Sequence, residues 1–253
     1  GNAVDAAIAT ALAVGVVQPA GSGLGGGGFA VVVTPKGDAT VIDFREVAPA
    51  AAHRDIYVEA AADDASRIGG LAVGVPGEGI GLAELHARWG KTPLVDLAAP
   101  AARLAEDGFE VHAHLAKSLQ RMGEDAQPLA SGLFGSEVVP VRGDIVRRER
   151  LAKTLRVFGR HGKDAFRRGP IATDIANAAQ ASGGVLTAAD LENYTVKVRS
   201  PIEAQYRGWR VISMPPPSSG GVVLGQVLGV LEKDDIASLG HNSAAMIHRV
   251  AEA

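Results

Sequence analysis

The pattern of apolar and polar positions predicts a helix followed by a hairpin at the start of the chain. Residues 2–17 are apolar on nearly every helical face, which is typical of a helix buried between layers, and Asn2 is a good N-cap. Glycines crowd residues 21–28, where no regular structure is expected. Residues 29–34 form a β-branched run of strand length, and residues 39–44 have the pattern of a returning strand. The expected order is therefore helix, glycine loop and hairpin.

Helical periodicity dominates the middle of the chain. Apolar residues recur at three- and four-residue spacing after Pro93, which suits a helix start, and Gly108 is typical of a helix end. The predicted helices cover residues 77–89, 93–107, 115–122, 151–158 and 171–181.

A second β segment follows the helices. Thr187 and Asp190 have the spacing of a capping box for one more short helix. Residues 195–199 and 202–214 favour strands with a turn near residues 207–208, and an apolar helix is expected over residues 222–231. A strand pair, a block of helices and further strands together predict an α+β fold with mixed layers.

Composition indicates a folded, weakly acidic protein and makes several classes improbable. The 253 residues correspond to about one or two domains. Lys and Arg number 25 against 28 Asp and Glu, so no general attraction to nucleic-acid phosphates or anionic lipids is expected. The absence of cysteine excludes a disulfide framework, a thiolate zinc site and a cysteine nucleophile within these residues.

The two ends predict that this sequence is part of something longer. It starts at Gly1 rather than Met and stops at Ala253, inside a run with helical spacing and no stop signal. The apolar stretch over residues 6–17 is shorter than the roughly 18 residues that a membrane helix needs, and no basic region precedes it as in a signal peptide. We therefore expect no membrane span in this segment, while the compartment stays open.

The glycine loop admits more than one interpretation. Its glycines at positions 21, 23 and 26 match the spacing of a dinucleotide fingerprint, but that motif binds pyrophosphate only where a strand leads into a helix. Here the expected order is helix, glycines, strand. A structural turn and a loop bordering a ligand site both fit the sequence better than nucleotide binding.

Arg45 is the strongest candidate binding residue. It stands where the second hairpin strand ends, in Asp43-Phe-Arg-Glu-Val-Ala-Pro49. A structural ion pair with a neighbouring acid is one interpretation. The other is a carboxylate clamp, because a guanidinium binds a carboxylate through two parallel hydrogen bonds and keeps its charge at any working pH. The residues alone leave both open.

Two further groups carry weaker signals. Glu110, His112 and His114 alternate like metal ligands, but no other cluster keeps zinc-like spacing with them, so polar positions at the entrance to a helix are the better interpretation. Ser218 and Ser219 lack the G-x-S-x-G elbow of a nucleophilic serine and are typical of a cap or loop. We predict no metal site and no cofactor.

Five motifs together resemble the γ-glutamyltranspeptidase family in order and spacing. The resemblance runs through the whole chain and covers most of that family's large subunit. The motifs are Asn2-Ala-Val-Asp-Ala-Ala7, Ser22-Gly-Leu-Gly-Gly-Gly-Gly-Phe29, Asp43-Phe-Arg-Glu-Val-Ala-Pro49, Val73-Gly-Val-Pro-Gly77 and Met214-Pro-Pro-Pro-Ser-Ser-Gly-Gly221.

The resemblance implies an N-terminal nucleophile hydrolase with an αββα sandwich, made as a precursor that cleaves itself into two subunits. Residues 1–253 would be the large-subunit part of a single domain, truncated at both ends. The N-terminal Thr of the small subunit would attack γ-glutamyl amides such as glutathione, with its own amine as base. The implied partners are that substrate and the chain's own small subunit, and the implied location is periplasmic or secreted.

The site residues that the resemblance implies are few. None of the eight threonines lies in a Thr-x-His-x-Ser-like cleavage segment, so we expect no catalytic residue in this chain and no activity from it alone. Arg45, in the family's Arg-Glu-x-Ala-Pro motif, would bind the α-carboxylate of the γ-glutamyl group. The glycine loop and residues 215–221 would be scaffold.

Two alternatives remain at this point. A related amidohydrolase on the same scaffold, such as a cephalosporin-type acylase or a capsule transpeptidase, would act on a different amide. A non-catalytic module would use the glycine loop for binding.

Overall fold

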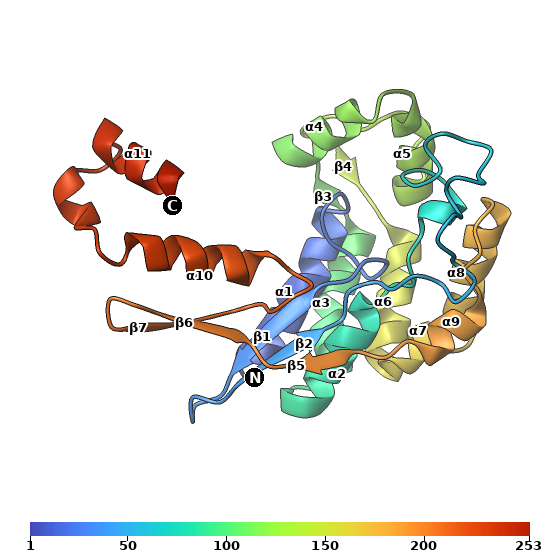
Figure 1. Ribbon diagram of the computed structural model, residues 1–253. Helices are drawn as coiled ribbons and strands as arrows, with labels where there is room; N and C mark the ends of the chain where they lie inside the picture. The colour runs from blue at the N-terminus through green and yellow to red at the C-terminus, as the bar shows by residue number, and fades with distance from the viewer. The chain divides into compact units, whose positions relative to one another are not determined.

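The computed structural model describes residues 1–253 and divides them into two compact units (Figure 1). Unit 1 comprises residues 1–28 and 44–196, and unit 2 comprises residues 29–43 and 197–253. Most helices belong to unit 1, whereas unit 2 holds the main sheet and a hairpin with its helices. This mixture of helices and antiparallel strands confirms the predicted α+β class.

The elements of each unit follow the chain in order. Unit 1 contains α1 (Ala3–Val17), η1 (Gly70–Ala72), α2 (Glu78–Trp89), α3 (Leu94–Asp107), β3 (Phe109–Glu110), α4 (Ala113–Arg121), η2 (Gly123–Asp125), α5 (Ala126–Phe134), β4 (Ile145–Val146), α6 (Glu149–His161), α7 (Asp164–Arg167), α8 (Pro170–Ala181) and α9 (Ala188–Asn193). Unit 2 contains β1 (Phe29–Val33), β2 (Ala39–Asp43), β5 (Lys197–Arg199), β6 (Ile202–Tyr206), β7 (Trp209–Ser213), α10 (Gly220–Leu231), η3 (Ile236–Leu239) and α11 (Ala244–Glu252).

The core of unit 1 forms where α1, α3 and α6 lie side by side (Figure 1). Ile8, Leu12, Leu155 and Phe158 are almost completely buried there. The Phe158 ring also meets the ring of Phe166 edge to face at 5.9 Å between centroids. Three- and four-residue spacing of apolar side chains thus identified helices that supply this core.

Helix α1 differs from its expected environment. It buries the face that carries Ile8, Leu12 and Val16, while Ala6 and Val14 on another face are exposed. The expectation that this helix is enclosed between layers is not met within these residues. Apart from Thr10, the exposed side is made of apolar residues, so the sequence contains no polar stripe that would mark it.

The N-terminal end of α1 is fixed by a buried carboxylate. Asn2 and Asp5 form a capping box, and Asp5 is only 2% exposed. The backbone N–H groups of Lys91 and Thr92 also donate to Asp5, at 2.9 and 3.2 Å. Burial opposes ionisation of Asp5, but these donors outweigh it and lower its pKa to about 2. The carboxylate therefore ties α1 to the α2–α3 connection.

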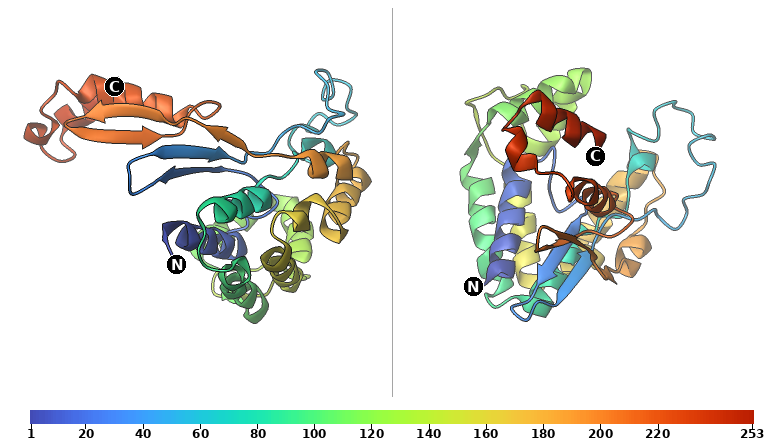
Figure 2. Two further views of the ribbon diagram at one scale, coloured as in Figure 1. Left: turned by 90° about the horizontal axis from the view of Figure 1, so that it is seen from below. Right: turned by 60° about the vertical axis from the view of Figure 1, so that its left-hand side comes forward.

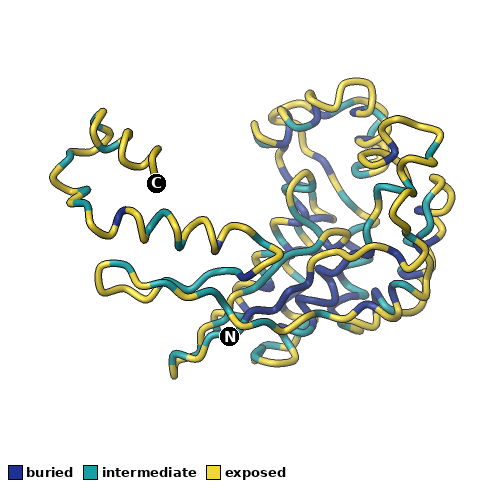
Figure 3. Tube along the Cα trace, in the orientation of Figure 1, coloured by how far each residue is buried: buried dark blue, intermediate teal, exposed yellow.

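Unit 2 contains an antiparallel sheet in the order β1–β2–β5 and a separate β6–β7 hairpin. Buried Asp43 at the end of β2 accepts a 2.7 Å hydrogen bond from the Arg199 guanidinium on β5. The hairpin turns at Arg207 and Gly208, both with positive φ. Helix α10 packs along this hairpin (Figure 2) and, like α11, is largely exposed (Figure 3). None of the helices combines the length and the hydropathy that a membrane span requires.

Candidate binding site at Arg45

Arg45 lies two residues beyond the end of β2, and its side chain is exposed. Neighbouring Phe44 is buried, with its ring against Gly28 and Gly81. The predicted position after the strand is therefore confirmed, and the change from buried to exposed occurs within one residue. Asp43, one of the two acids next to Arg45 in the sequence, binds the Arg199 guanidinium.

The backbone on both sides of Arg45 is held by strand-like pairs. Phe44 exchanges two hydrogen bonds with Gly28, at 2.9 and 3.3 Å, and Val47 pairs with Val75 in an isolated antiparallel bridge. These partners come from two of the five motifs on which the resemblance rests. The glycine loop and residues 73–77 thus fix the main chain from which the Arg45 side chain projects.

The backbone of the glycine loop packs directly against residues 45–46, with no room for a side chain at Gly27. A Cβ atom on Gly27 would lie 2.8 Å from the Arg45 Cα and 2.6 Å from the Glu46 nitrogen, distances that a side chain cannot occupy. The Gly26 carbonyl accepts the N–H groups of Gly77 and Glu78, both at 2.9 Å. The loop therefore works as scaffold for close packing, as expected, and it leads into β1 rather than into a helix.

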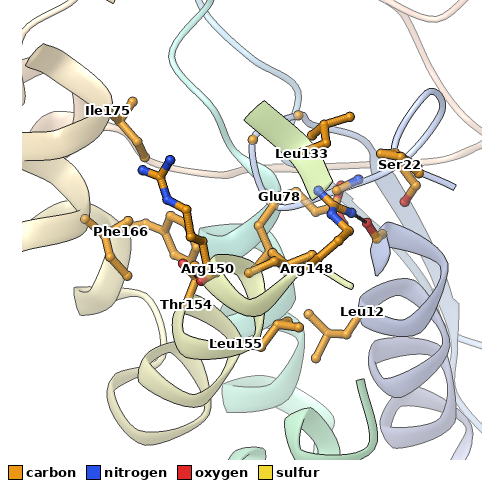
Figure 4. Close-up of a pocket in the computed structure, with 18 of the residues that line it drawn as sticks. Leu12, Ser22, Glu78, Leu133, Arg148, Arg150, Thr154, Leu155, Phe166 and Ile175 are labelled. Atoms are coloured by element: carbon orange, nitrogen blue, oxygen red, sulfur yellow. Dashed lines mark hydrogen bonds between the residues drawn. The ribbon is translucent and has the colours of Figure 1, made fainter. Parts of the chain in front are cut away.

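A cavity of about 790 Å³ borders the glycine loop within unit 1 (Figure 4). It is lined by residues 19–27 together with side chains from α1, α6, α7 and α8, and Arg45 is not among them. Its most buried charged groups are Glu78, at the start of α2, and Arg148, at the start of α6. The cavity and Arg45 thus lie at different places around the same loop.

Glu78 and Arg148 both form hydrogen bonds with the protein's own backbone. Arg148 reaches the last turn of α1, where Nη1 donates to the carbonyls of Gly15 and Val16 at 2.7 and 3.0 Å (Figure 4). Burial lowers the pKa of Arg148 to about 10. Burial also raises the pKa of Glu78, against the weaker effect of the Gly23 N–H, which donates at 3.4 Å. Arg148 therefore binds the end of α1, and Glu78 binds the glycine loop at Gly23.

The weaker candidates of the sequence have structural roles. His112 caps α4 by accepting the Leu115 N–H at Nδ1, and its other ring nitrogen lies 3.2 Å from the Val17 carbonyl. No group of three or more His, Asp or Glu side chains is placed to hold a metal ion. Ser219 occupies the N-cap position of α10, and the Ser218 hydroxyl accepts the Gly220 N–H at 3.3 Å. The cap or loop interpretation of both serines agrees with this geometry.

Sequence reasoning missed Glu78, Arg148 and Tyr194. The Tyr194 hydroxyl donates to the Arg45 carbonyl at 2.8 Å, across 149 residues of sequence. Glu78 carried one usable signal, because it follows Pro76-Gly77 at a helix start, where acids are favoured. Nothing local marks the other two, whose partners are backbone carbonyls distant in sequence.

Comparison with known proteins gives consistent results along the whole chain. The family model described as Gamma-glutamyltranspeptidase matches residues 1–253. The chain is 40% identical to a glutathione hydrolase proenzyme of Escherichia coli, aligning over all of this chain and 45% of that protein. It therefore spans somewhat less than half the length of that curated relative.

Solved structures agree with the fold. A crystal structure of Helicobacter pylori γ-glutamyltranspeptidase aligns with a TM-score of 0.89 at 36% identity, over 99% of this chain and 74% of that one. A cephalosporin acylase from Bacillus halodurans aligns with a TM-score of 0.84 at 30% identity, over 98% of this chain and 47% of that one.

The fold and these likenesses define an α+β protein of the N-terminal nucleophile hydrolase type. Within that class, the match over residues 1–253 settles the family. The chain belongs to the γ-glutamyltranspeptidase family, as its five motifs predicted.

Proposed function

We propose that this chain is the large-subunit part of a γ-glutamyltransferase or glutathione hydrolase, and that Arg45 binds the α-carboxylate of the γ-glutamyl group. The observation that carries the proposal is the placement of Arg45. Its guanidinium projects from a backbone held by pairing with Gly28 and by the Val47–Val75 bridge, while its side chain is exposed to an incoming ligand. A guanidinium presented in this way matches a carboxylate with two hydrogen bonds.

The proposed reaction is acyl transfer through a covalent intermediate. A threonine hydroxyl outside this chain attacks the γ-carbonyl, its proton passes to the threonine's own amine, and the amide C–N bond breaks as the amine product takes up a proton. Water or an acceptor amine then attacks the γ-glutamyl ester and restores the hydroxyl. Arg45 contributes by fixing the α-carboxylate end, which holds the γ-carbonyl at a set distance from the nucleophile.

Removal of the Arg45 guanidinium tests this role. In the complete protein, Arg45→Ala should raise KM for a γ-glutamyl anilide by about 10- to 100-fold, because a hydrogen-bonded charge contributes about 1.5–3 kcal/mol. Arg54→Ala is the matched control, since Arg54 belongs to the same unit and its side chain is 95% exposed. An Arg45→Ala variant with the KM of the Arg54→Ala variant would refute the role.

A second candidate is a related amidohydrolase, favoured by the likeness to the Bacillus halodurans acylase. Glutaryl and γ-glutamyl anilides differ only in the α-amino group and share the carboxylate that Arg45 would bind. Preference for the γ-glutamyl compound supports the transferase or hydrolase, and preference for the glutaryl compound supports an acylase.

The glycine loop offers little to a nucleotide-binding module. Its amides are used within the protein: Gly26 donates to Gly23, Gly28 donates to Phe44, and Gly21 and Ser22 donate to Gln18. An anion cradle needs several such N–H groups directed at the ligand. Tight nucleotide binding measured by calorimetry, in a protein that never separates into two chains, would favour the module instead.

A further inference from the structure

Helix α9 contacts the Arg45 segment at two points. Tyr194, directly after α9, is buried at 4% exposure and donates its hydroxyl to the Arg45 carbonyl at 2.8 Å. Five residues further along the segment, the Ala50 N–H donates to the Asp190 carboxylate of α9 at 2.8 Å. One short helix thus holds both ends of residues 45–50.

The Asp190 carboxylate of α9 is itself held in place by hydrogen bonds. Asp190 forms a capping box with Thr187, whose hydroxyl and N–H donate to it at 2.7 and 2.8 Å. Burial acts against ionisation of Asp190, but the donors from Ala50 and Thr187 lower its pKa overall. The carboxylate is therefore ionised at neutral pH and serves α9 and the Arg45 segment together.

The Tyr194 hydroxyl lies so close to Gly77 that a side chain at position 77 would collide with it. A Cβ on Gly77 would lie 2.1 Å from the Tyr194 oxygen and 2.1 Å from the Phe44 carbonyl. Only glycine at position 77 lets the phenol reach the Arg45 carbonyl beside this backbone. The Tyr194 hydroxyl thus lies next to two of the five motifs, the one around Arg45 and the one that ends at Gly77.

We propose that Tyr194 is a positioning residue for Arg45: its hydroxyl fixes the peptide after Arg45, and so the direction in which the guanidinium projects. This inference rests on the proposed function of Arg45. A two-point guanidinium–carboxylate contact depends strongly on direction, and a long side chain amplifies a small rotation of the backbone that carries it. In this role Tyr194 acts through Arg45 rather than on the reacting atoms.

The test is Tyr194→Phe in the complete protein, which removes one oxygen and keeps the ring. Tyr57→Phe is the matched control, because the Tyr57 hydroxyl also donates to a backbone carbonyl, but to that of Leu71, at 3.2 Å, rather than to one of the Arg45 segment. We expect Tyr194→Phe to raise KM for a γ-glutamyl anilide about three- to tenfold with kcat within about twofold, in line with the loss of one neutral hydrogen bond. We expect the KM of Tyr57→Phe to match that of the unmodified protein.

A double variant separates positioning from general loosening of the fold. If Tyr194 acts through Arg45, Tyr194→Phe should leave KM unchanged when it is added to Arg45→Ala. Equal KM changes in the Tyr194→Phe and Tyr57→Phe proteins, or additive effects in the double variant, would overturn the inference. The proposed function fails separately, if Arg45→Ala alone leaves KM unchanged.

Discussion

Asp5 and Arg45 are two charged residues with opposite surroundings. Asp5 is buried, and its oxygens accept hydrogen bonds from Asn2, Lys91 and Thr92. Arg45 is exposed, while its backbone is held by the glycine loop and by Tyr194. At Asp5 the protein's own donors bind the charged group, whereas the donors at Arg45 bind the main chain beneath an exposed side chain.

The comparison distinguishes a charge that stabilises the fold from one that, under the proposed function, binds a ligand. A buried carboxylate with several donors contributes to stability, because removing it leaves those donors without a partner. An exposed guanidinium contributes little to stability, but a rigid backbone beneath it lowers the conformational cost of binding. We therefore expect changes at Asp5 to reduce stability and changes at Arg45 to weaken substrate binding.

The largest effect is expected at Gly77, where a substitution should both reduce stability and weaken substrate binding. In Gly77→Ala the new methyl group would collide with the Phe44 carbonyl and the Tyr194 hydroxyl, each 2.1 Å from the Cβ position. We expect a loss of about 3 kcal/mol of stability, measured by denaturant unfolding, together with a raised KM.

Gly25→Ala is the control for this substitution. Gly25 also lies in a motif of the family, but a Cβ there would meet nothing within 4 Å. A Gly77→Ala protein as stable as Gly25→Ala would mean that the packing around Arg45 is looser than described.

Asp5→Asn should reduce stability and leave KM unchanged. The pKa of Asp5 is lowered from 3.8 to about 2, so its ionised form stabilises the fold above about pH 4, and this contribution is lost as the pH falls through 2. The difference in Tm between the parent protein and Asp5→Asn, measured by calorimetry, should be large at pH 5 and shrink towards pH 2.

Asp107→Asn provides the comparison for Asp5, since Asp107 is exposed at the end of α3. Its Tm should follow that of the parent protein at every pH. A constant gap between Asp5→Asn and the parent protein across the same range would contradict the account of the buried carboxylate.

The smallest effect is expected at Glu78. Burial raises the pKa of this carboxyl, so the folded protein binds its proton more tightly than the unfolded chain does. Stability is then lost as the pH rises from the ordinary pKa of 4.5 through the raised value. Glu78→Gln cannot undergo this change, and its Tm relative to the parent protein should increase between pH 4.5 and 7. A pH-independent difference would contradict the raised pKa.

Sequence patterns identified most elements because their causes are local. The capping residues Asn2 and Thr187, the helix-ending Gly108 and the Arg207–Gly208 turn all act within a few residues of themselves. The pairing of β5 with β2 had no such local cause and was not predicted.

The site shows the same division. Arg45 could be located from the end of a strand and from a family motif. The Tyr194 hydroxyl bond and the contacts of Arg148 with the end of α1 depend on tertiary packing between distant segments. Their acceptors are backbone carbonyls, which every residue has, so no side-chain pattern in the sequence identifies them.

The most direct test of the Arg45 account compares two substrates that differ at one group. In the complete protein, kcat/KM is measured for a γ-glutamyl anilide and for the same compound with its α-carboxylate converted to an amide. The parent protein should prefer the carboxylate by about 10- to 100-fold, and in Arg45→Ala this preference should fall to near one. An equal preference in both proteins would contradict the assignment of Arg45 as the carboxylate-binding residue.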